Sequence, residues 1–564
     1  MRQNTERLAP PEMKTSSNER IQELTASGAW GNETLHGLLA QWCQRAPDRL
    51  AVADQPNCEE LTGSPPHRLN FAQLDNASDT LAADLLLRGV GADSRVMVQL
   101  PNTCELVVCY YALSKLGAVI SPVPVQYRAH ELGSMAATLS PNLFIGIDSL
   151  RGEPLAALAE EAIKNCPTIA FGRELALSSE ADAAAKAAVE AHRNAHPDDA
   201  NTIISICWTS GTTGTPKGVP RSHNMWLATA RSTINAGDYR EGDALLNPFP
   251  LVNMAAVGGF LYPAALKGCS LVLHHPLEPA VYLQQLSTEA INFSIAPPAL
   301  LNQLAKDSAL WQKFDFGNLR AIGSGSAPLS PEMIATFDRD YGVPVVNFYG
   351  SNEGISLFAT PANAEDPDVR ATMFPRAEST AQALYSQVID QDTGKPITEA
   401  NRPGELCFGG ATVFDGYLGH SNEGVFSEQG LFRTGDLVEI CGDPPDYYRI
   451  VGRCKDIINR GGMKISPSEL DVLLEAFPGL TEAAVCPYPD DRLGEKICAC
   501  VVPAQGEPAP TLDEICQYLS DNGLAKFKLP ERIALLERLP RNPMGKVLRG
   551  ELTQQVTTLE NSHD

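Results

Sequence analysis

The segment 209–218 carries residues suited to binding a polyanion, and its sequence is Thr209-Ser210-Gly211-Thr212-Thr213-Gly214-Thr215-Pro216-Lys217-Gly218. It follows an apolar run, 203–208, that predicts a β-strand. Glycines let the backbone approach phosphate oxygens and present N–H groups to them, and the hydroxyls and Lys217 add donors. The segment is not a Walker P-loop, because Lys217 lies between Pro216 and Gly218. We expect a different phosphate-binding loop, with a solvated Gly/Thr turn as the alternative.

Three further segments carry charged, aromatic and glycine residues: Asn347-Phe348-Tyr349-Gly350-Ser351-Asn352-Glu353; Phe432-Arg433-Thr434-Gly435-Asp436 followed by Gly452-Arg453-Cys454-Lys455-Asp456; and Pro540-Arg541-Asn542-Pro543-Met544-Gly545-Lys546. In these four segments, their order and their intervals, the chain resembles the adenylate-forming superfamily of acyl-CoA synthetases, adenylation domains and luciferases. The resemblance extends from about 35 to 549. It is closest to acid:CoA ligases around 102–132 and in the spacing between Asn253 and Gly268.

The resemblance implies a two-step reaction. A monocarboxylic acid attacks the α-phosphorus of ATP, pyrophosphate leaves, and the acyl group then passes from the adenylate to the thiol of CoA. Because both reactants of the first step are anions, the site must neutralise charge and hold them in line. The family's catalytic positions correspond to Lys546, Glu353 and Lys217. Lys546 would bridge the acid and the α-phosphate, and Glu353 would hold the Mg²⁺ that accompanies ATP.

The same resemblance assigns the nucleotide contacts. Two carboxylate oxygens suit a vicinal diol, so Asp436 would bind the ribose hydroxyls, with Arg453 as its companion. Asn347 and Tyr349 would contact adenine from one side, and the segment 326–328 from the other. The expected ATP- or AMP-binding residues are Thr209, Ser210, Gly211, Thr212, Thr213, Gly214, Ser326, Ala327, Pro328, Asn347, Tyr349, Asn352, Asp436 and Arg453.

Further positions concern the acid, the thiol and domain movement. Lys455 matches the family hinge, about which rotation would withdraw Lys546 and open a path for the thiol. Gly461 and Gly462 would approach that path, and Lys464 either meets a CoA phosphate or is solvated. The expected acid pocket consists of small or neutral residues: Asn253, Met254, Ser324, Gly325, Gly350 and Ile355. They favour a medium-sized apolar or cyclic acid.

Three residues depart from the family pattern. Asn352 replaces the usual Thr before the magnesium glutamate, and Met544 replaces a Ser or Thr before Gly545. Asn253 occupies a position that is often aromatic or His, which indicates either an unusual pocket or a neutral packing change. Two alternatives to a CoA ligase therefore stay open. One is a freestanding enzyme that loads an acyl or peptidyl carrier protein, and the other is a non-catalytic relative that binds nucleotide or acid.

Alternating strand and helix patterns predict an α/β fold with parallel βαβ units. We expect strands at 95–100, 118–122, 143–147, 203–208, 270–274 and 320–323, and helices at 74–87, 105–116 and 176–194. Beyond Gly452 the pattern changes to short strands at 483–487 and 497–502 between helices at 467–477 and 512–522. The expected organisation is a disordered or loosely packed N-terminus (1–28), a large AMP-binding region of several α/β subdomains (29–452) and a small mobile α+β domain (453–564).

Composition narrows the class of protein. The formal net charge of −24 disfavours nucleic acid and anionic lipid as partners. Most of the 14 cysteines, such as Cys486, are isolated, and Cys498 and Cys500 alternate within one predicted strand, so we expect free thiols in a reducing compartment. The acidic first 30 residues lack a signal-peptide pattern, and the most apolar stretch, 251–273, predicts a buried helix plus strand and not a membrane span. We expect a cytoplasmic monomer or homodimer that uses ATP, an acid and CoA.

Overall fold

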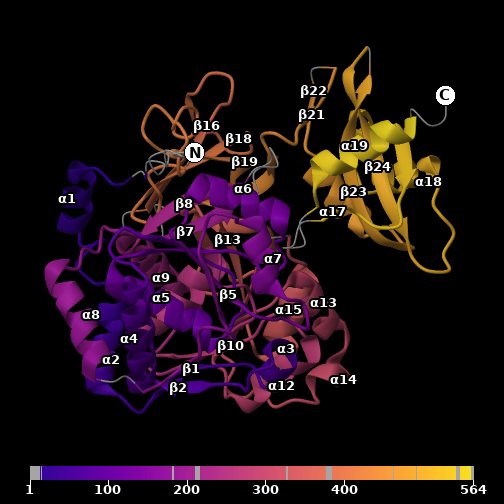
Figure 1. The fold of residues 1–564 in the computed structure, drawn as a ribbon. Coiled ribbons are helices and arrows are strands. Elements are labelled where there is room, and N and C mark those ends of the chain that lie inside the picture. Colours follow the sequence, from indigo (N-terminus) through magenta and orange to yellow (C-terminus); the bar gives the residue numbers. More distant parts are fainter. Residues whose placement is uncertain are drawn as a thin grey trace, which may run out of the picture.

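The computed structural model describes Met13 and residues 15–180, 183–209, 216–325, 328–376, 384–461, 463–490, 492–541 and 547–560. Two sheets built mainly of parallel strands form the lower body of the molecule (Figure 1). A third, antiparallel sheet lies above them, and a smaller C-terminal unit, drawn in yellow, stands to the right (Figure 1). This is the mixed α/β architecture that the sequence predicts, with a large N-terminal and a small C-terminal part.

The first sheet has the strand order β6 (Thr168–Phe171), β5 (Leu143–Ile147), β3 (Arg95–Val98), β4 (Val119–Pro122), β7 (Ile203–Thr209) and β8 (Lys217–Ser222). All neighbours are parallel except β8, which pairs antiparallel with β7. The helices between or beside these strands are α4 (Phe71–Leu87), α5 (Cys104–Leu116), α6 (Ala129–Leu139), α7 (Leu155–Ala162), α8 (Ala183–Ala195) and α9 (His223–Gly237). The predicted βαβ units are therefore confirmed.

The second sheet has the order β14 (Ser356–Ala359), β13 (Val345–Gly350), β12 (Ala321–Gly325), β11 (Phe293–Ile295), β9 (Ala244–Asn247), β10 (Ser270–Leu273), β1 (Leu50–Ala53) and β2 (Arg68–Asn70). Only the edge strands β14 and β2 pair antiparallel. Its helices are α2 (Leu35–Arg45), α3 (Cys58–Thr62), α12 (Pro279–Thr288), α13 (Pro298–Lys306), α14 (Ser308–Trp311), α15 (Pro331–Thr336) and the π-helical η2 (Phe337–Tyr341). The apolar stretch near 251–273 forms α10 (Met254–Ala256), the π-helical η1 (Val257–Leu261), α11 (Tyr262–Lys267) and β10, as predicted.

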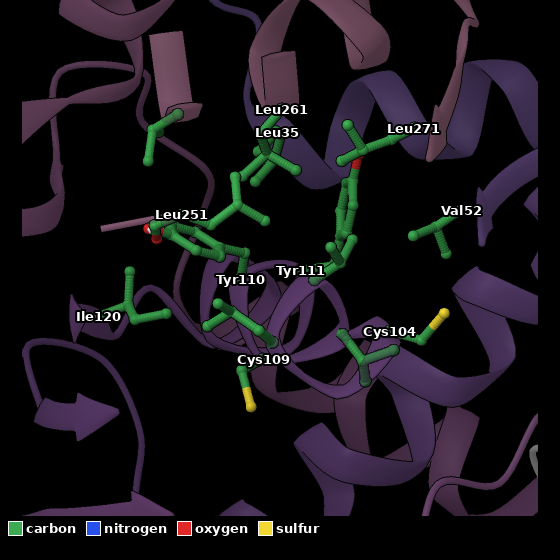
Figure 2. Packing of buried hydrophobic residues seen from close by; sticks show 14 of the residues in the cluster. Leu35, Val52, Cys104, Cys109, Tyr110, Tyr111, Ile120, Leu251, Leu261 and Leu271 are labelled. Carbon is green, nitrogen blue, oxygen red and sulfur yellow. Dashed lines mark hydrogen bonds between the residues drawn. The ribbon is translucent and has the colours of Figure 1, made fainter. Parts of the chain in front are cut away.

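Helix α5 lies at the centre of the largest hydrophobic cluster, and every one of its residues is buried. Figure 2 shows Tyr110 and Tyr111 of this helix surrounded by side chains from several distant elements. The Tyr110 hydroxyl donates a hydrogen bond of 2.8 Å to the Leu251 carbonyl, which satisfies the one polar atom of that side chain. A helix that is buried on all faces is enclosed by its neighbours, so α5 ties the two parallel sheets into one body.

The third sheet has the order β15 (Met373–Pro375), β20 (Tyr447–Arg453), β19 (Phe432–Cys441), β18 (Gly404–Gly410), β16 (Leu384–Ile389) and β17 (Pro396–Ile397), and α16 (Pro367–Thr372) precedes it. All its pairings are antiparallel. Its core includes Val219 from β8 and Leu357 from β14, so it packs where the two parallel sheets end. Its strands β19 and β20 carry Asp436 and Arg453.

The C-terminal unit contains β22 (Met463–Ile465), β21 (Ile458–Arg460), β24 (Gly494–Pro503), β23 (Leu480–Asp490) and β25 (Arg532–Leu535). Its helices are α17 (Pro467–Glu475), α18 (Leu512–Asp521), the short 3₁₀ helix η4 (Lys526–Lys528) and α19 (Arg549–Glu560). One hydrophobic cluster lies on each face of this sheet. Strands and helices occur where the sequence predicts them, to within a few residues.

The cysteines are free thiols, as expected. Cys498 and Cys500 point to the same face of β24, while Ala499 belongs to the cluster on the other face. The expectation that Cys486 is isolated is wrong, because β23 pairs Cys486 directly with Cys498 and its sulfur lies 3.6 Å from that of Cys500. The three thiols pack beneath Leu552 and Val556 of α19.

One local expectation differs from the structure. Residues 176–180 are not helical and α8 spans Ala183–Ala195 among the described residues, because Leu175 forms a β-bridge with Phe171 and Leu177 packs against the main core. In the N-terminal region, residues 18–26 form helix α1 (Asn18–Ala26), in which Leu24 is buried and most of the other residues are exposed. Among the helices that the structure describes, none is both long and apolar enough to span a membrane.

Candidate functional site

The predicted phosphate loop connects the two strands of an antiparallel hairpin. Thr209 at the end of β7 pairs directly with Lys217 at the start of β8. A strand follows the lysine here, whereas a helix follows it in a P-loop, so the exclusion of that motif holds. The Lys217 ammonium lies 4.8 Å from the ring centre of Tyr417. The hairpin therefore places Thr209 and Lys217 at the same end of the first sheet.

Glu353 follows β13 in a tight loop and is only 8% exposed. Its Oε1 atom accepts a hydrogen bond of 2.8 Å from the Tyr417 hydroxyl, and its carbonyl accepts one of 2.9 Å from the Phe414 N–H. Gly354 has φ of +119°, and a Cβ atom there would lie 2.1 Å from the Thr412 carbonyl oxygen. Only glycine fits this close approach, so the backbone after Glu353 is held against the segment 410–418.

Asp436 is held from two sides. The Tyr349 hydroxyl donates a hydrogen bond to Asp436 Oδ2, and Arg453 Nε lies 2.6 Å from Oδ1. Asp436 and Arg453 are direct partners in the β19–β20 pairing. Burial, followed by the charge of Asp436, raises the pKa of Tyr349 well above its usual value, so the phenol remains a donor. Three of the residues that the resemblance assigns to ribose and adenine thus meet at one point.

Asn347 lies on β13, and its side chain is buried. The amide nitrogen donates hydrogen bonds of 2.9 and 3.0 Å to the carbonyls of Arg370 and Ala371 in the last turn of α16. This arrangement fixes the orientation of the amide and keeps its oxygen as an acceptor. Pro328, after β12, is exposed.

Asn352 joins three parts of the site. Its side-chain oxygen accepts a hydrogen bond of 2.8 Å from the Met254 N–H, and its nitrogen donates one of 3.0 Å to the Trp208 carbonyl. Its own carbonyl accepts a bond of 2.8 Å from the guanidinium of Arg221. The amide donor of this predicted ATP-binding residue is therefore engaged with the strand before the phosphate loop. Asn352 connects that strand to the start of α10, where the acid pocket is predicted.

Arg221, in β8, is fully buried, and burial lowers its pKa to about 10. Its Nη2 atom donates to the Met225 carbonyl at 3.1 Å and to Thr229 Oγ1 at 2.9 Å. Its guanidinium carbon lies 4.3 Å from the centre of the Trp226 ring. The Arg221 guanidinium therefore has a structural role, since its hydrogen bonds support the loop that contains Asn352 and Glu353.

The predicted acid-pocket residues lie at the ends of β12 and β13 and at the start of α10. Asn253 Oδ1 caps α10 by accepting a bond of 3.2 Å from the Ala256 N–H. The Ser324 hydroxyl donates to the Ala296 carbonyl at 2.9 Å, and Ile355 is buried in the core of the third sheet. A Cβ atom at Gly325 would lie 2.1 Å from the Phe348 carbonyl oxygen, so no side chain fits there. Gly350 ends β13.

The predicted hinge residue, Lys455, is exposed in the turn between β20 of the third sheet and β21 of the C-terminal unit. Gly461 lies in the turn between β21 and β22, and the backbone of Lys464 pairs with Asn459 in that hairpin. On either side of the segment 542–546, Arg541 and Val547 form a β-bridge. Several predicted residues lie outside the described residues: Ser210, Gly211, Thr212, Thr213, Gly214, Ser326, Ala327, Gly462 and Lys546.

Comparison with known families assigns both parts of the chain. Residues 39–418 match the sequence profile of the AMP-binding enzymes, and residues 469–546 match the profile of the AMP-binding enzyme C-terminal domain. The chain belongs to the AMP-binding enzyme family. It is an adenylate-forming acid ligase, as the four sequence motifs indicate.

Known proteins are similar to this AMP-binding enzyme along nearly its whole length. A salicyl-AMP ligase / salicyl-S-ArCP synthetase of Mycobacterium tuberculosis is 30% identical over 95% of this chain and 93% of its own. A medium-chain fatty-acid–CoA ligase of Escherichia coli is 29% identical over 96% and 94%, respectively. The crystal structure of ATP-bound MatB from Rhodopseudomonas palustris superposes with a TM-score of 0.77 at 23% identity, covering 93% of this chain and all of that one, which shows a shared fold.

Sequence reasoning missed two residues of this AMP-binding enzyme's site, Tyr417 and Arg221. The hydroxyl of Tyr417 contacts a carboxylate 64 positions earlier in the chain, and no local pattern indicates that pairing. Gly416 directly before Tyr417 is the one cue, since glycine next to an aromatic residue often marks a close approach. Arg221 lies in a short strand whose neighbours give no indication that a cation is buried there.

Proposed function

We propose that this ligase is an AMP-forming acid:CoA ligase, which converts a monocarboxylic acid to its adenylate and then to its CoA thioester. The main support for the adenylation step is the position of the Asp436 carboxylate. It is held between Tyr349 and Arg453 and adjoins the loop of Glu353. A carboxylate held in this way presents acceptors to two neighbouring hydroxyls, as the ribose of ATP requires. Asn347 Oδ1 would accept from the exocyclic amine of adenine.

Glu353 fits a magnesium ligand. Its Oε1 atom receives the Tyr417 hydroxyl, which fixes the carboxylate while its other oxygen keeps its lone pairs. Within the described residues there is no cluster of three or more side chains that could hold a metal. A single fixed carboxylate suits Mg²⁺, which usually takes one or two protein carboxylates and completes its shell with phosphates and water. When bound with ATP, the ion would neutralise the charge that develops on the leaving pyrophosphate.

The remaining roles in adenylation follow from charge. Lys217 is placed beside the phosphate loop and would bind the leaving pyrophosphate. Lys546 would bridge the acid carboxylate and the α-phosphate, as the family resemblance implies. The loop that contains Asn352 joins the nucleotide side of the site to Met254, so the acid would be held against the same loop as the metal ligand.

CoA is the favoured acceptor, and a carrier protein is the second candidate. The similarity to a fatty-acid–CoA ligase supports CoA, and the similarity to a salicyl-S-ArCP synthetase supports a carrier. Both names concern apolar or aromatic acids, which agrees with small and neutral pocket residues such as Met254 and Gly325. We therefore propose an aromatic or medium-chain monocarboxylic acid as the substrate.

Two measurements on one preparation test this proposal. ATP–pyrophosphate exchange across a panel of salicylate, coumarate, indoleacetate, octanoate and dicarboxylates would identify the acid, and AMP must be the nucleotide product. Thioester formation is then followed with CoA and, in parallel, with an aryl carrier protein charged with phosphopantetheine. Transfer only to the carrier would replace the CoA assignment, and the absence of exchange with every acid would favour a non-catalytic relative.

A further inference from the structure

The N-terminal segment 15–31, here called the N-terminal strap, is bound to the loop 410–418. Arg20 of α1 donates through Nη2 to the carbonyls of Gly410 at 3.0 Å and Val413 at 2.5 Å, and through Nη1 to Asp415 Oδ1. The Ser16 hydroxyl donates to the other oxygen of Asp415 at 2.6 Å. Nearly 400 positions separate these partners in the chain. One guanidinium thus binds three acceptors at the end of β18 and in the loop that follows it.

Apolar packing holds the strap in the same place. Trp30 and Leu24 are buried against Met225 and Ala228 of α9 and against Ala411. The Trp30 indole N–H donates a hydrogen bond of 3.0 Å to the Ala411 carbonyl. The strap therefore donates to three backbone carbonyls of this stretch, those of Gly410, Ala411 and Val413. Without those donors, buried carbonyl groups would need water or a new loop conformation.

The same loop contacts the Glu353 segment through other atoms. Thr412 Oγ1 donates to the Gly354 carbonyl at 2.6 Å, the Phe414 N–H to the Glu353 carbonyl at 2.9 Å, and the Tyr417 hydroxyl to Glu353 Oε1. Further along, the Leu418 N–H donates a bond of 2.9 Å to the Gly218 carbonyl, next to Lys217. The residues bound by the strap alternate with the residues that bind Glu353, so both sets share one short stretch of backbone.

We propose that Arg20 is a positioning residue for adenylation, which acts through the loop 410–418 to hold Glu353 and Lys217 in place. The inference rests on the proposed roles of those two residues in binding magnesium and pyrophosphate. A site that must orient a metal and a triphosphate works only if its supporting contacts are fixed beforehand, and displacement by about 1 Å can cost on the order of a hundredfold in rate. Arg20 supplies that support from outside the AMP-binding profile, which begins at residue 39.

The test compares Arg20→Gln with Arg231→Gln in the full-length protein. Arg231 also anchors the N-terminal region, since it donates to the Ala29 carbonyl at 2.9 Å and to Glu33 at 3.2 Å, but these contacts do not involve the loop. Hydrogen exchange of the nucleotide-free proteins is followed in peptides covering 408–420 and 349–356. Arg20→Gln should speed exchange in both peptides, and Arg231→Gln in neither. In ATP–pyrophosphate exchange, Arg20→Gln should raise KM for MgATP by about tenfold or more and leave KM for the acid nearly unchanged.

Asp415→Asn provides a second variant that weakens the same contact at the loop, in case Arg20→Gln folds poorly. Arg20→Lys should behave between the wild type and Arg20→Gln, because lysine keeps the charge but not the three-way contact. Unchanged exchange at 349–356 in both Arg20→Gln and Asp415→Asn would overturn the proposal. So would an equal rise of KM in Arg231→Gln, because the strap would then act only through general stability. If the wild-type protein lacks adenylation, the proposed function fails, while hydrogen exchange still decides whether Arg20 fixes the Glu353 loop.

Discussion

The Tyr417 hydroxyl donates a hydrogen bond of 2.8 Å to Glu353 Oε1, while the ring of the same tyrosine lies 4.8 Å from the ammonium of Lys217. One side chain thus contacts both the proposed metal ligand and the lysine of the phosphate loop. Burial, followed by the Glu353 charge, raises the pKa of Tyr417 above its usual value, so it stays protonated and remains a donor at neutral pH.

Tyr417→Phe should keep the ring beside Lys217 and remove only the bond to Glu353. We expect a loss of about tenfold to a hundredfold in kcat/KM for MgATP, because one charge-assisted hydrogen bond contributes ~1.5–3 kcal/mol. The Mg²⁺ concentration needed for half-maximal exchange should rise as well. Tyr341→Phe is the matched control, since the Tyr341 hydroxyl donates a hydrogen bond of 2.7 Å to the Leu304 carbonyl, away from the site. Equal behaviour of the two variants would contradict a role for Tyr417 in orienting Glu353.

Asp436→Ala should remove the proposed ribose contact and leave Tyr349 and Arg453 without their shared partner. We expect KM for ATP to rise by about tenfold or more, since a buried group left unpaired costs ~1–3 kcal/mol. Nucleotide analogues supply the internal control: the wild-type protein should discriminate against 2′-deoxy-ATP and 3′-deoxy-ATP, and the variant should discriminate much less. A variant that still prefers ATP as strongly as the wild type would show that another residue binds the diol.

Lys546→Ala should reduce adenylation by at least about a hundredfold, the scale for losing one transition-state electrostatic contact. Thioester formation from a pre-made acyl-adenylate should be much less affected, because we propose that the lysine is withdrawn in that step. Both half-reactions are measured on one preparation, with Lys526→Ala, in the remote η4, as the control. Equal losses in the two half-reactions would mean that Lys546 acts through structure.

Lys455→Pro should separate the half-reactions in the opposite sense. The residue is exposed in the turn between β20 and β21, and proline fixes φ near about −65° and removes a backbone donor. A hinge that must take up two backbone states would then be held in one, so pyrophosphate exchange should survive while transfer to the thiol falls. Thioester formation at the wild-type rate, or an equally deep loss of exchange, would remove the support for a hinge at Lys455.

Histidine burial predicts a loss of stability in acid. Burial, reinforced by the nearby His36, lowers the pKa of His223 to about 3, from 6.5 for an unperturbed histidine. Between these two values the unfolded chain binds a proton that the folded protein does not. The free energy of unfolding should therefore fall as pH falls below 6.5, by up to about 1.4 kcal/mol per pH unit from this residue.

Urea midpoints at pH 7.5 and 5.0 measure this effect. His223→Asn should be less stable than the wild type at pH 7.5, because it loses contacts to Leu35 and Tyr262, but its midpoint should fall less on acidification. His130→Asn, at an exposed position in α6, should keep the full pH dependence. An unchanged slope in His223→Asn would assign the acid sensitivity to other groups.

The sequence alone determined the local elements and the types of chemistry. The strand before the phosphate loop, the helix at 105–116 and the C-terminal strands follow from runs and periodicities of apolar residues, and the structure reproduces them closely. The pairing of Asp436 with Arg453 was also within reach, because both belong to motifs that the resemblance identifies. Where local propensity and tertiary contact compete, as at 176–180, the pattern overextends the helix, because Leu177 is drawn to the core.

Only the tertiary structure decided how the site is supported. Tyr417 reaches Glu353, Asn352 reaches Met254 and Trp208, and Arg20 reaches Asp415, each across a long stretch of chain. A sequence pattern reports the face of a helix or strand on which a residue lies, but not which distant backbone comes to rest against it. These contacts are set by how three sheets pack, and a hydrogen bond between distant segments forms only after that packing has brought its donor and acceptor together.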